Sequence, residues 1–346
     1  MIRVLVAEDS VTVRELLVGI LESDPEIRVV GQAKNGVEAV ELAVRLKPNL
    51  ITMDVHMPLL DGFEATKEIM IRAPTPIILV SSSASRREVE LSLNAMRAGA
   101  LMALEKPDDP GSETFNGRST HFRSMVKAMA QVKVVRRWGP RVQVSPAPPV
   151  AGDRVPKTRI RFVAIVASTG GPAALQRILA DLPGDFPIPI AVVQHIARGF
   201  VGGLADWLNT SCNLRVKVAE HGETVARHTV LLAPDDRHLA VGPGGRVVLS
   251  DAPPVNRFRP SGTYLFESAA EAYGAGLGAI ILTGMGRDGV DGLAAVKAKG
   301  GYVIAQDEAT SVVYGMPREA VAAGVVEAVL PVEQIAPRLA HLVLAL

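Results

Sequence analysis

Short aliphatic runs alternate with amphipathic stretches along residues 1–107. Between the runs, apolar residues recur at helical spacing, as in Val11–Glu22 and Gly36–Lys47. Parallel strands are expected, because short connections with intervening helices indicate right-handed crossovers. The pattern therefore predicts a flavodoxin-like α/β domain of five βα units, with strands at Arg3–Ala7, Arg28–Gly31, Leu50–Met53, Pro76–Val80 and Leu101–Leu104.

The same alternation resumes in residues 159–346. An aliphatic strand, Arg161–Ala167, precedes a glycine-containing turn and the helix Ala173–Leu182, and a second strand covers Ile188–Gln194. We expect a second, doubly wound α/β domain, whose chemistry lies at the carboxyl ends of its strands. The length agrees with this division, because 346 residues correspond to about two domains.

The segment 108–158 differs in composition from the regions on either side. Residues 110–160 carry ten Lys and Arg against two acidic residues, and six prolines interrupt any long packed element. We interpret 108–158 as a basic linker. Within it, Phe122, Val126 and Met129 recur at helical spacing, which predicts a short helix that packs on a neighbouring domain or docks an acidic partner. No recognised motif accompanies the charge, so nucleic-acid binding is not expected.

The cysteine content and the hydrophobic runs bear on the compartment. The single cysteine, Cys212, excludes a disulfide framework and favours a reducing environment. The chain enters a strand at once, without the charged and apolar regions of a signal peptide. No apolar run approaches the roughly 18 uninterrupted residues of a membrane span. We therefore expect a cytoplasmic protein with no direct membrane insertion.

Polar side chains collect at the predicted strand ends of residues 1–107. Glu8 and Asp9 follow the first strand, Asp54 the third, Ser81 the fourth and Lys106 the fifth. A single acid in such a place is usually a solvated loop residue. Three carboxylates brought to one edge of a sheet require a cation, and oxygen ligands of this kind suit Mg²⁺.

Three residues of complementary chemistry also follow strands in the second half. Ser168 lies in a turn at a helix start, His195 follows the next strand 27 residues later, and Asp288 follows the strand Ala279–Leu282. Ser168 and Asp288 could each be a helix cap, and His195 a structural residue. Together the three predict a Ser-His-Asp triad. The seven histidines show no ligand spacing that would favour zinc.

Residues 1–107 resemble a two-component receiver domain. The resemblance rests on Glu8-Asp9, on Asp54 followed by Val55-His56-Met57-Pro58, and on Lys106-Pro107. It implies that Asp54 accepts a phosphoryl group from a histidine kinase, and that His56 contributes only backbone. It further implies that Mg²⁺ is held by Glu8, Asp9 and Asp54, while Ser81, with Ser82 and Ser83 as alternatives, and Lys106 contact the phosphoryl oxygens.

The whole chain resembles the chemotaxis response-regulator protein-glutamate methylesterase family. The motifs that carry this likeness are Ala167–Pro172, Gln194–His195, Leu232–His238, Leu282–Gly289 and Ala305–Glu308. The resemblance implies hydrolysis of methyl esters on glutamates of the chemoreceptor cytoplasmic domain, with methanol released, together with glutamine deamidation and no cofactor for the hydrolysis. It further implies Ser168 as nucleophile, His195 as base, Asp288 as its orienting acid, and Thr169 and the Met285 region in oxyanion stabilisation.

Two departures from the family pattern and two alternatives remain. Ala197–Gly199 and Arg259–Tyr264 differ from the usual family residues, and these segments are expected to line the substrate cleft. One alternative is a phosphorylation-switched binding module with an inactive hydrolase domain. The other, a nucleotide-binding enzyme, lacks a Walker lysine and a Gly-x-Gly-x-x-Gly motif. For regulation, the tether favours a receiver that docks over the hydrolase cleft until Asp54 is phosphorylated.

Overall fold

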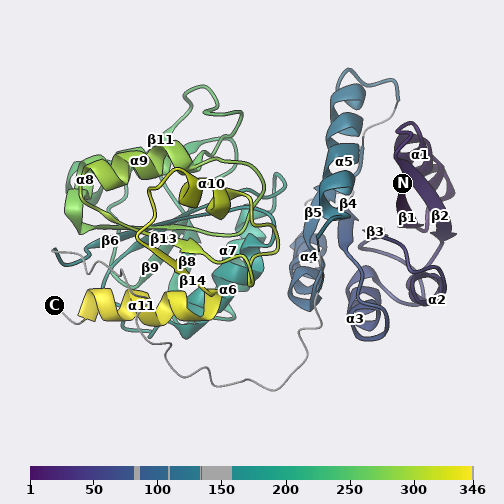
Figure 1. The fold of residues 1–346 in the computed structure, drawn as a ribbon, viewed down its shortest axis with the longest axis horizontal. Coiled ribbons are helices and arrows are strands. Elements are labelled where there is room, and N and C mark those ends of the chain that lie inside the picture. Colours follow the sequence, from purple (N-terminus) through teal and green to yellow (C-terminus); the bar gives the residue numbers. More distant parts are fainter. Residues whose placement is uncertain (82–85, 108–109, 133, 135–157, 345–346) are drawn as a thin grey trace. The chain divides into compact units, whose positions relative to one another are not determined.

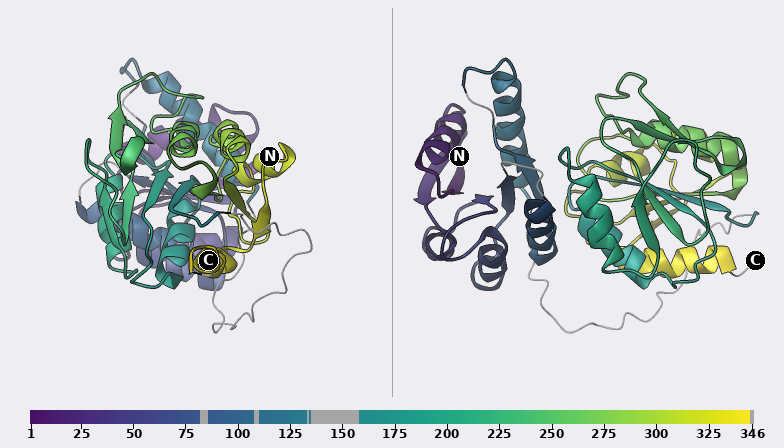
Figure 2. Two further views of the ribbon diagram at one scale, coloured as in Figure 1. Left: turned by 90° about the vertical axis from the view of Figure 1, so that its left-hand side faces the viewer. Right: turned by 180° about the vertical axis from the view of Figure 1, so that it is seen from behind.

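The protein divides into two compact units, Met1–Val142 and Gln143–Leu346 (Figure 1). In each unit, helices cover both faces of a parallel sheet (Figure 2). The computed structural model describes residues 1–81, 86–107, 110–132, 134 and 158–344. Residues 108–109, 133 and 135–157 of the predicted linker lie outside the described residues, as do Ser82 and Ser83.

The first unit contains a five-stranded sheet in the order β2-β1-β3-β4-β5. β3 and β4 are buried along their whole length because helices cover both faces, which explains their continuous aliphatic sequences. Side chains of Ser10, Asn35 and Asp61 cap the first three helices. The elements are β1 (Ile2–Ala7), α1 (Val11–Glu22), β2 (Ile27–Ala33), α2 (Gly36–Leu46), β3 (Leu50–Asp54), α3 (Gly62–Arg72), β4 (Ile77–Ser81), α4 (Arg86–Ala98), β5 (Met102–Glu105) and α5 (Phe115–Met129).

Helix α5 belongs to the first unit, although its sequence lies in the predicted linker. Phe122, Val126 and Met129 are buried, and the helix contacts α1 and β4. Lys127 pairs with Glu26 and, at 3.3 Å, with Asp24. The helical stripe thus packs on the neighbouring domain, and the predicted boundary at residue 107 leaves out this last helix of the unit.

The second unit contains a seven-stranded parallel sheet in the order β14-β13-β12-β6-β7-β9-β8 and an antiparallel pair, β10 and β11. Short 3-10 helices cover Pro243–Gly245 and Gly274–Gly276. The elements are β6 (Phe162–Ala167), α6 (Gly171–Asp181), β7 (Ile190–Gln194), α7 (Val201–Asn209), β8 (Arg215–Val218), β9 (Thr229–Leu232), β10 (His238–Val241), β11 (Val247–Ser250), α8 (Gly262–Tyr273), β12 (Leu277–Ile281), α9 (Val290–Ala298), β13 (Tyr302–Gln306), α10 (Met316–Ala322), β14 (Ala328–Leu330) and α11 (Val332–Leu344).

The strand order of this sheet reverses at β6. The chain moves from β6 to β7 on one side, and later strands, beginning with β12, are added on the other side. Such a switch point opens a crevice at the carboxyl ends of the strands, because the flanking connections leave in opposite directions. Ser168, His195 and Asp288 follow β6, β7 and β12 respectively, so all three predicted residues lie at this place.

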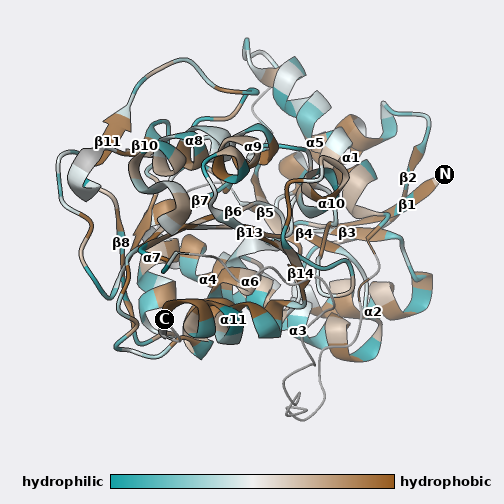
Figure 3. Cartoon of the chain, turned by 60° about the vertical axis from the view of Figure 1, so that its left-hand side comes forward, coloured by the Kyte–Doolittle hydropathy of each residue, from teal (hydrophilic) through white to brown (hydrophobic). Residues whose placement is uncertain are grey.

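The core of the second unit explains why β6 is central. All six of its residues are buried, and alternate side chains, Phe162, Ala164 and Val166, join a cluster with residues of α8, α9 and the neighbouring strands. Figure 3 shows the same division, with hydrophobic colour along the strands and hydrophilic colour on the outer helix surfaces. The strand that carries Ser168 is therefore fixed on both faces.

Candidate phosphorylation and hydrolase sites

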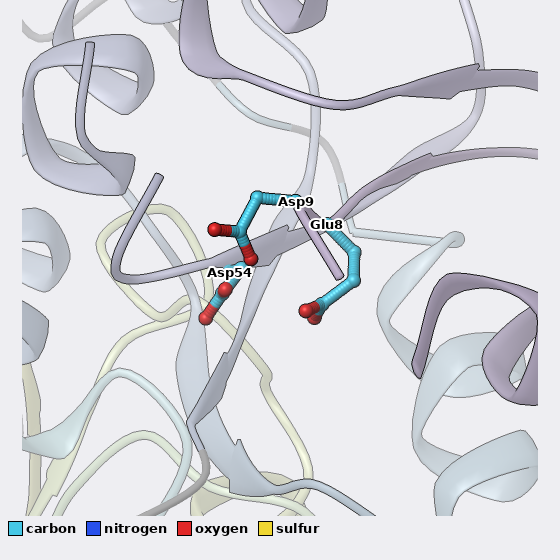
Figure 4. Close-up of side chains that lie close together, drawn as sticks. All are labelled: Glu8, Asp9 and Asp54. Carbon is cyan, nitrogen blue, oxygen red and sulfur yellow. The ribbon is translucent and has the colours of Figure 1, made fainter. Parts of the chain in front are cut away.

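Three carboxylates meet at the carboxyl edge of the first sheet. Each of Glu8, Asp9 and Asp54 offers a ligand oxygen, and these oxygens lie within 4.8 Å of one another (Figure 4). Lys106 places its Nζ 2.8 Å from Glu8 Oε2 and 3.2 Å from Asp54 Oδ2. The structure thus brings together the four charged residues that the sequence places at these strand ends.

The charges in this pocket are not balanced. Glu8 and Asp54 are buried while Asp9 is exposed, so three carboxylates share one ammonium group. Burial raises the pKa of Glu8 and of Asp54 despite their contacts with Lys106. Burial alone would lower the pKa of Lys106, but its contacts with both acids raise it. A site with this excess of buried negative charge can accept a divalent cation.

The hydroxyl of Ser81 lies in a second polar contact at the same edge. Ser81 Oγ donates to Glu88 Oε2 at 3.3 Å, and His56 Nε2 lies 3.9 Å from Glu88 Oε1. Glu88 is buried in the first turn of α4. Glu88 lies outside the strand-end pattern, so the sequence does not predict its role, and only the fold places it beside Ser81.

Ser168 lies in the turn between β6 and α6, and its side chain does not cap the helix. The helix α6 has Gly170 at its cap position, with φ of 78°, and no side chain caps it. The Ser168 carbonyl accepts from Gly171 N at 2.8 Å and from Gln194 Nε2 at 2.9 Å. Ser168 therefore does not cap α6, and the alternative prediction of a helix-capping serine is wrong.

Sheet register places His195 beside Ser168. Ala167 pairs with Gln194 across β6 and β7, and the His195 N–H donates to the Ala167 carbonyl at 2.9 Å. His195 Nε2 lies 3.0 Å from Asp288 Oδ2, and its ring stacks on Phe258 with centroids 4.2 Å apart. Both ring nitrogens are buried. Among the residues that the structure describes, Nδ1 has no hydrogen-bond partner, and the contact of Nε2 with Asp288 is close in distance without the geometry of a hydrogen bond.

Asp288 is a buried carboxylate surrounded by donors. Oδ1 accepts from Ser261 Oγ at 2.8 Å and Thr263 N at 3.3 Å, and Oδ2 accepts from Gly262 N at 2.6 Å. Burial alone would raise the pKa of Asp288, but His195 and the donors of Gly262 and Ser261 hold it below its usual value. The predicted alternative, a cap of the following helix, is replaced by an unforeseen one: Asp288 caps α8, while α9 begins at Gly289 without a side-chain cap.

Two loops converge at Ser168. The Ser168 N–H donates to the Thr283 carbonyl at 3.0 Å, and Thr283 Oγ1 donates to the carbonyl of Thr169 at 2.9 Å. A Cβ on Gly284 would lie only 2.7 Å from Ser168 Cβ, so this position requires glycine. The predicted oxyanion residues follow the same division, since Thr169 is buried in one loop and Met285 is 41% exposed in the other.

Further side chains hold these loops in place, and the sequence pattern predicts a role for none of these side chains. Gln306 Oε1 accepts from Thr283 N at 2.8 Å, and Asp235 Oδ2 accepts from Gly199 N at 2.8 Å after the loop of His195. Gln306 and Asp235 belong to two of the motifs that carry the family resemblance, but the sequence alone gives no physical reason for their presence. Phe258 lies just before Arg259–Tyr264, the segment noted only as a departure from the family pattern.

Fold and sites together define the class: a phosphoacceptor-type receiver joined to an α/β hydrolase domain. Comparison with known families agrees, since the response regulator receiver domain matches residues 4–112 and the CheB methylesterase domain matches residues 163–339. A protein-glutamate methylesterase/protein-glutamine glutaminase of Myxococcus xanthus is 53% identical over 339 residues, covering 98% of this chain and 96% of its own. One from Anaeromyxobacter dehalogenans is also 53% identical, over 98% of both chains.

The chain belongs to the protein-glutamate methylesterase/protein-glutamine glutaminase family, with a receiver domain at its N-terminal end. A crystal structure of the methylesterase catalytic domain from Thermotoga maritima is 42% identical, with a TM-score of 0.52, and covers 54% of this chain and 100% of its own. The predictions of family, enzyme class and α/β architecture are confirmed. None of the described helices is both long and apolar enough for a membrane crossing.

Proposed function

We propose that this chain hydrolyses methyl esters of glutamate side chains on chemoreceptors, with release of methanol, and deamidates receptor glutamines in the same site. The observation that carries the proposal is the contact of His195 Nε2 with Asp288 Oδ2 at 3.0 Å, next to Ser168, in a member of this family. The names of the relatives support the substrate class.

In this mechanism Ser168 Oγ attacks the ester carbonyl carbon while His195 takes the hydroxyl proton. Nδ1 is the nitrogen available for that proton, because Nε2 faces Asp288. The tetrahedral intermediate collapses, the C–O bond to the methoxy group breaks, and His195 returns the proton to the leaving methanol. Water then attacks the acyl-enzyme by the same route and frees the glutamate and Ser168. With a glutamine substrate, ammonia leaves in place of methanol.

Asp288 and the two convergent loops support the charges that develop. The Asp288 carboxylate stabilises the imidazolium form of His195 and fixes the ring, which also stacks on Phe258. Backbone N–H groups at the start of α6 and in the Met285 turn are the candidates for stabilising the oxyanion. Thr169 and Met285 are the residues that we assign to this region.

We further propose that the receiver is phosphorylated on Asp54 by a histidine kinase. Mg²⁺ would be held by Glu8, Asp9 and Asp54, whose oxygens and excess charge fit a hard divalent cation. When bound it neutralises phosphoryl charge. Lys106 already contacts Asp54 and would pair with a phosphoryl oxygen, and Ser81 would exchange its contact with Glu88 for one.

Phosphorylation is proposed to control access of the receptor to Ser168. The two catalytically distinct units and the intervening segment support regulation by docking and release. A cytoplasmic location follows from this proposal, because both the kinase and the receptor segment that it requires are cytoplasmic.

The decisive test compares Ser168→Ala with wild type on a methylated receptor fragment. Methanol release should fall by several powers of ten, since a nucleophile commonly contributes that much. The control is Ser268→Ala, which changes a partly buried serine of α8 away from the triad and should retain activity. Wild-type protein that fails to release methanol would instead favour the inactive binding module.

A further inference from the structure

Two buried polar residues near the triad have no part in the mechanism above. Ser261 and His238 are fully buried, and each makes specific hydrogen bonds. Buried polar groups cost stability unless they are paired, so the partners of these two side chains show what holds each of them in place. Ser261 contacts Asp288, and His238 contacts Ser261.

Ser261 occupies the cap position of α8 but does not cap it. Its side chain makes no hydrogen bond to its own helix, and its hydroxyl donates to Asp288 Oδ1 at 2.8 Å. The N–H of Thr263, which a capping serine can serve, donates to Asp288 instead, and so does the N–H of Gly262. The Ser261 hydroxyl therefore binds the Asp288 carboxylate instead of capping α8.

The geometry shows what this hydroxyl controls. Oδ2 is the oxygen that faces His195, and it is fixed on its own by Gly262 N at 2.6 Å. Oδ1 has Ser261 Oγ at 2.8 Å and only a long contact with Thr263 N at 3.3 Å. Without the hydroxyl, Oδ1 keeps only the long contact with Thr263 N, so the carboxylate turns more freely about its Cβ–Cγ bond. Oδ2 stays near Gly262 N, but its lone pairs are held less firmly in the direction of the imidazole.

His238 holds Ser261 in turn. Its Nδ1 accepts from the Ser261 backbone N–H at 3.2 Å, and its Nε2 bonds to the Pro253 carbonyl at 3.1 Å. A backbone N–H can only donate and a carbonyl only accept, so both contacts require the neutral ring with its proton on Nε2. The ring also stacks on Tyr264 with centroids 4.4 Å apart. His238 is thus fixed by three neighbours.

We propose that Ser261 is a positioning residue for Asp288 and that His238 holds Ser261 in the productive place. The inference rests on the proposed triad and extends it to a relay: His238 to Ser261, Ser261 to Asp288, Asp288 to His195. Ser261 lies in the segment expected to line the substrate cleft, but it is fully buried, as is His238, so neither side chain can touch substrate. Their effect is on the rate of the chemical step rather than on binding of the receptor.

The experiment uses the full chain with Ser261→Ala and, as a matched control on the same helix, Ser268→Ala. Ser268 Oγ donates to the Leu265 carbonyl and accepts from Val241 N, away from Asp288. We expect Ser261→Ala to lower kcat about tenfold or more with KM unchanged, since it removes a hydrogen bond to a charged group. Ser268→Ala should leave both constants near wild type.

A second readout separates this inference from the substrate assignment. A fluorophosphonate reagent labels an activated serine without needing a receptor, so its rate at Ser168 reports on the triad alone. We expect labelling of Ser261→Ala to slow in parallel with kcat, with melting temperatures showing both variants folded. Labelling of wild type without methanol release would refute the proposed substrate only. Equal labelling and equal kcat in the two serine variants would refute positioning by Ser261.

The role of His238 is tested by a double-mutant cycle. If His238 acts through Ser261, the effect of His238→Leu on labelling is large in the wild type and small once Ser261 is alanine. Additive effects would contradict the relay. Should His238→Leu fail to fold, His238→Phe keeps the aromatic stack on Tyr264, removes the acceptor for the Ser261 N–H and completes the same cycle.

Discussion

Replacing Asp288 by Asn tests the centre of the hydrolase site, because the amide has the shape of the carboxylate without its charge. Asp288 Oδ2 faces two donors, the N–H of Gly262 and His195 Nε2, while Oδ1 faces the Ser261 hydroxyl and Thr263 N. An amide offers only one acceptor oxygen. With its NH₂ on the Oδ2 side, the amide faces the Gly262 N–H, which cannot accept from it. With its NH₂ on the Oδ1 side, the Ser261 hydroxyl can turn and accept, but the Thr263 N–H loses its acceptor.

Two penalties follow from this mismatch. For stability, leaving a buried donor unsatisfied costs about 1–3 kcal/mol, and losing the negative charge at the start of α8 costs up to about 2 kcal/mol more. For catalysis, His195 loses the acid that fixes its tautomer and stabilises its imidazolium form, which in serine hydrolases lowers kcat by about 10⁴. We therefore expect a folded variant that is destabilised by about 2–4 kcal/mol and nearly inactive.

The assay combines urea denaturation with methanol release from a methylated receptor fragment. Asp291→Asn is the matched control, because Asp291 lies only three residues after Asp288. Its side chain is exposed at the start of α9, where it pairs with Arg287. This control should change neither stability nor activity appreciably, as expected for an exposed ion pair. A folded Asp288→Asn protein with more than about a tenth of wild-type kcat would refute the assignment of Asp288 as the orienting acid.

Three further predictions concern the receiver. Asp54→Asn should abolish phosphorylation by acetyl phosphate in Mg²⁺ while Asp24→Asn does not; equal phosphorylation would point to another acceptor. Because burial raises the pKa of Asp54 and Glu8, ionising them costs folded-state stability as pH rises above the ordinary values of 3.8 and 4.5. Mg²⁺ binds the ionised forms, so it should raise the melting temperature at pH 7.5 and lose this effect towards pH 4; an equal rise in Asp9→Asn and Asp54→Asn would contradict the site. A 159–346 fragment should release methanol faster than the unphosphorylated full chain, and phosphorylation should close much of the gap; a folded fragment that is no faster would exclude autoinhibition.

The strands and the strand-end residues could be predicted from the sequence for a simple physical reason. A parallel strand covered on both faces is a short aliphatic run, and the residue after it must lie at the carboxyl edge of the sheet. The pattern locates Asp54, Ser168 and His195 in this way, without knowledge of any contact. The rule needs no knowledge of which strands are neighbours.

Contacts that depend on strand order and helix register could not be predicted. The stripe of Phe122 and Val126 predicted a helix, but that this helix completes the first unit depends on its packing against α1 and β4. Asp288 could be expected to cap the helix next in sequence. It caps α8 instead, because the order of β6 and β12 brings the start of α8 against the end of β12.

The two buried aspartates at the strand ends differ in how their charge is supported, and this difference separates their chemistry. Asp288 is surrounded by Ser261, two backbone N–H groups and His195, so the protein itself satisfies its charge and its pKa lies below the ordinary value. Asp54 shares one Lys106 with Glu8, and its pKa is raised because burial outweighs that contact. A permanently ionised acid suits a residue that must stabilise an imidazolium in every turnover. An acid whose charge is left incompletely compensated suits a site that is completed from outside, by a cation and then by a phosphoryl group.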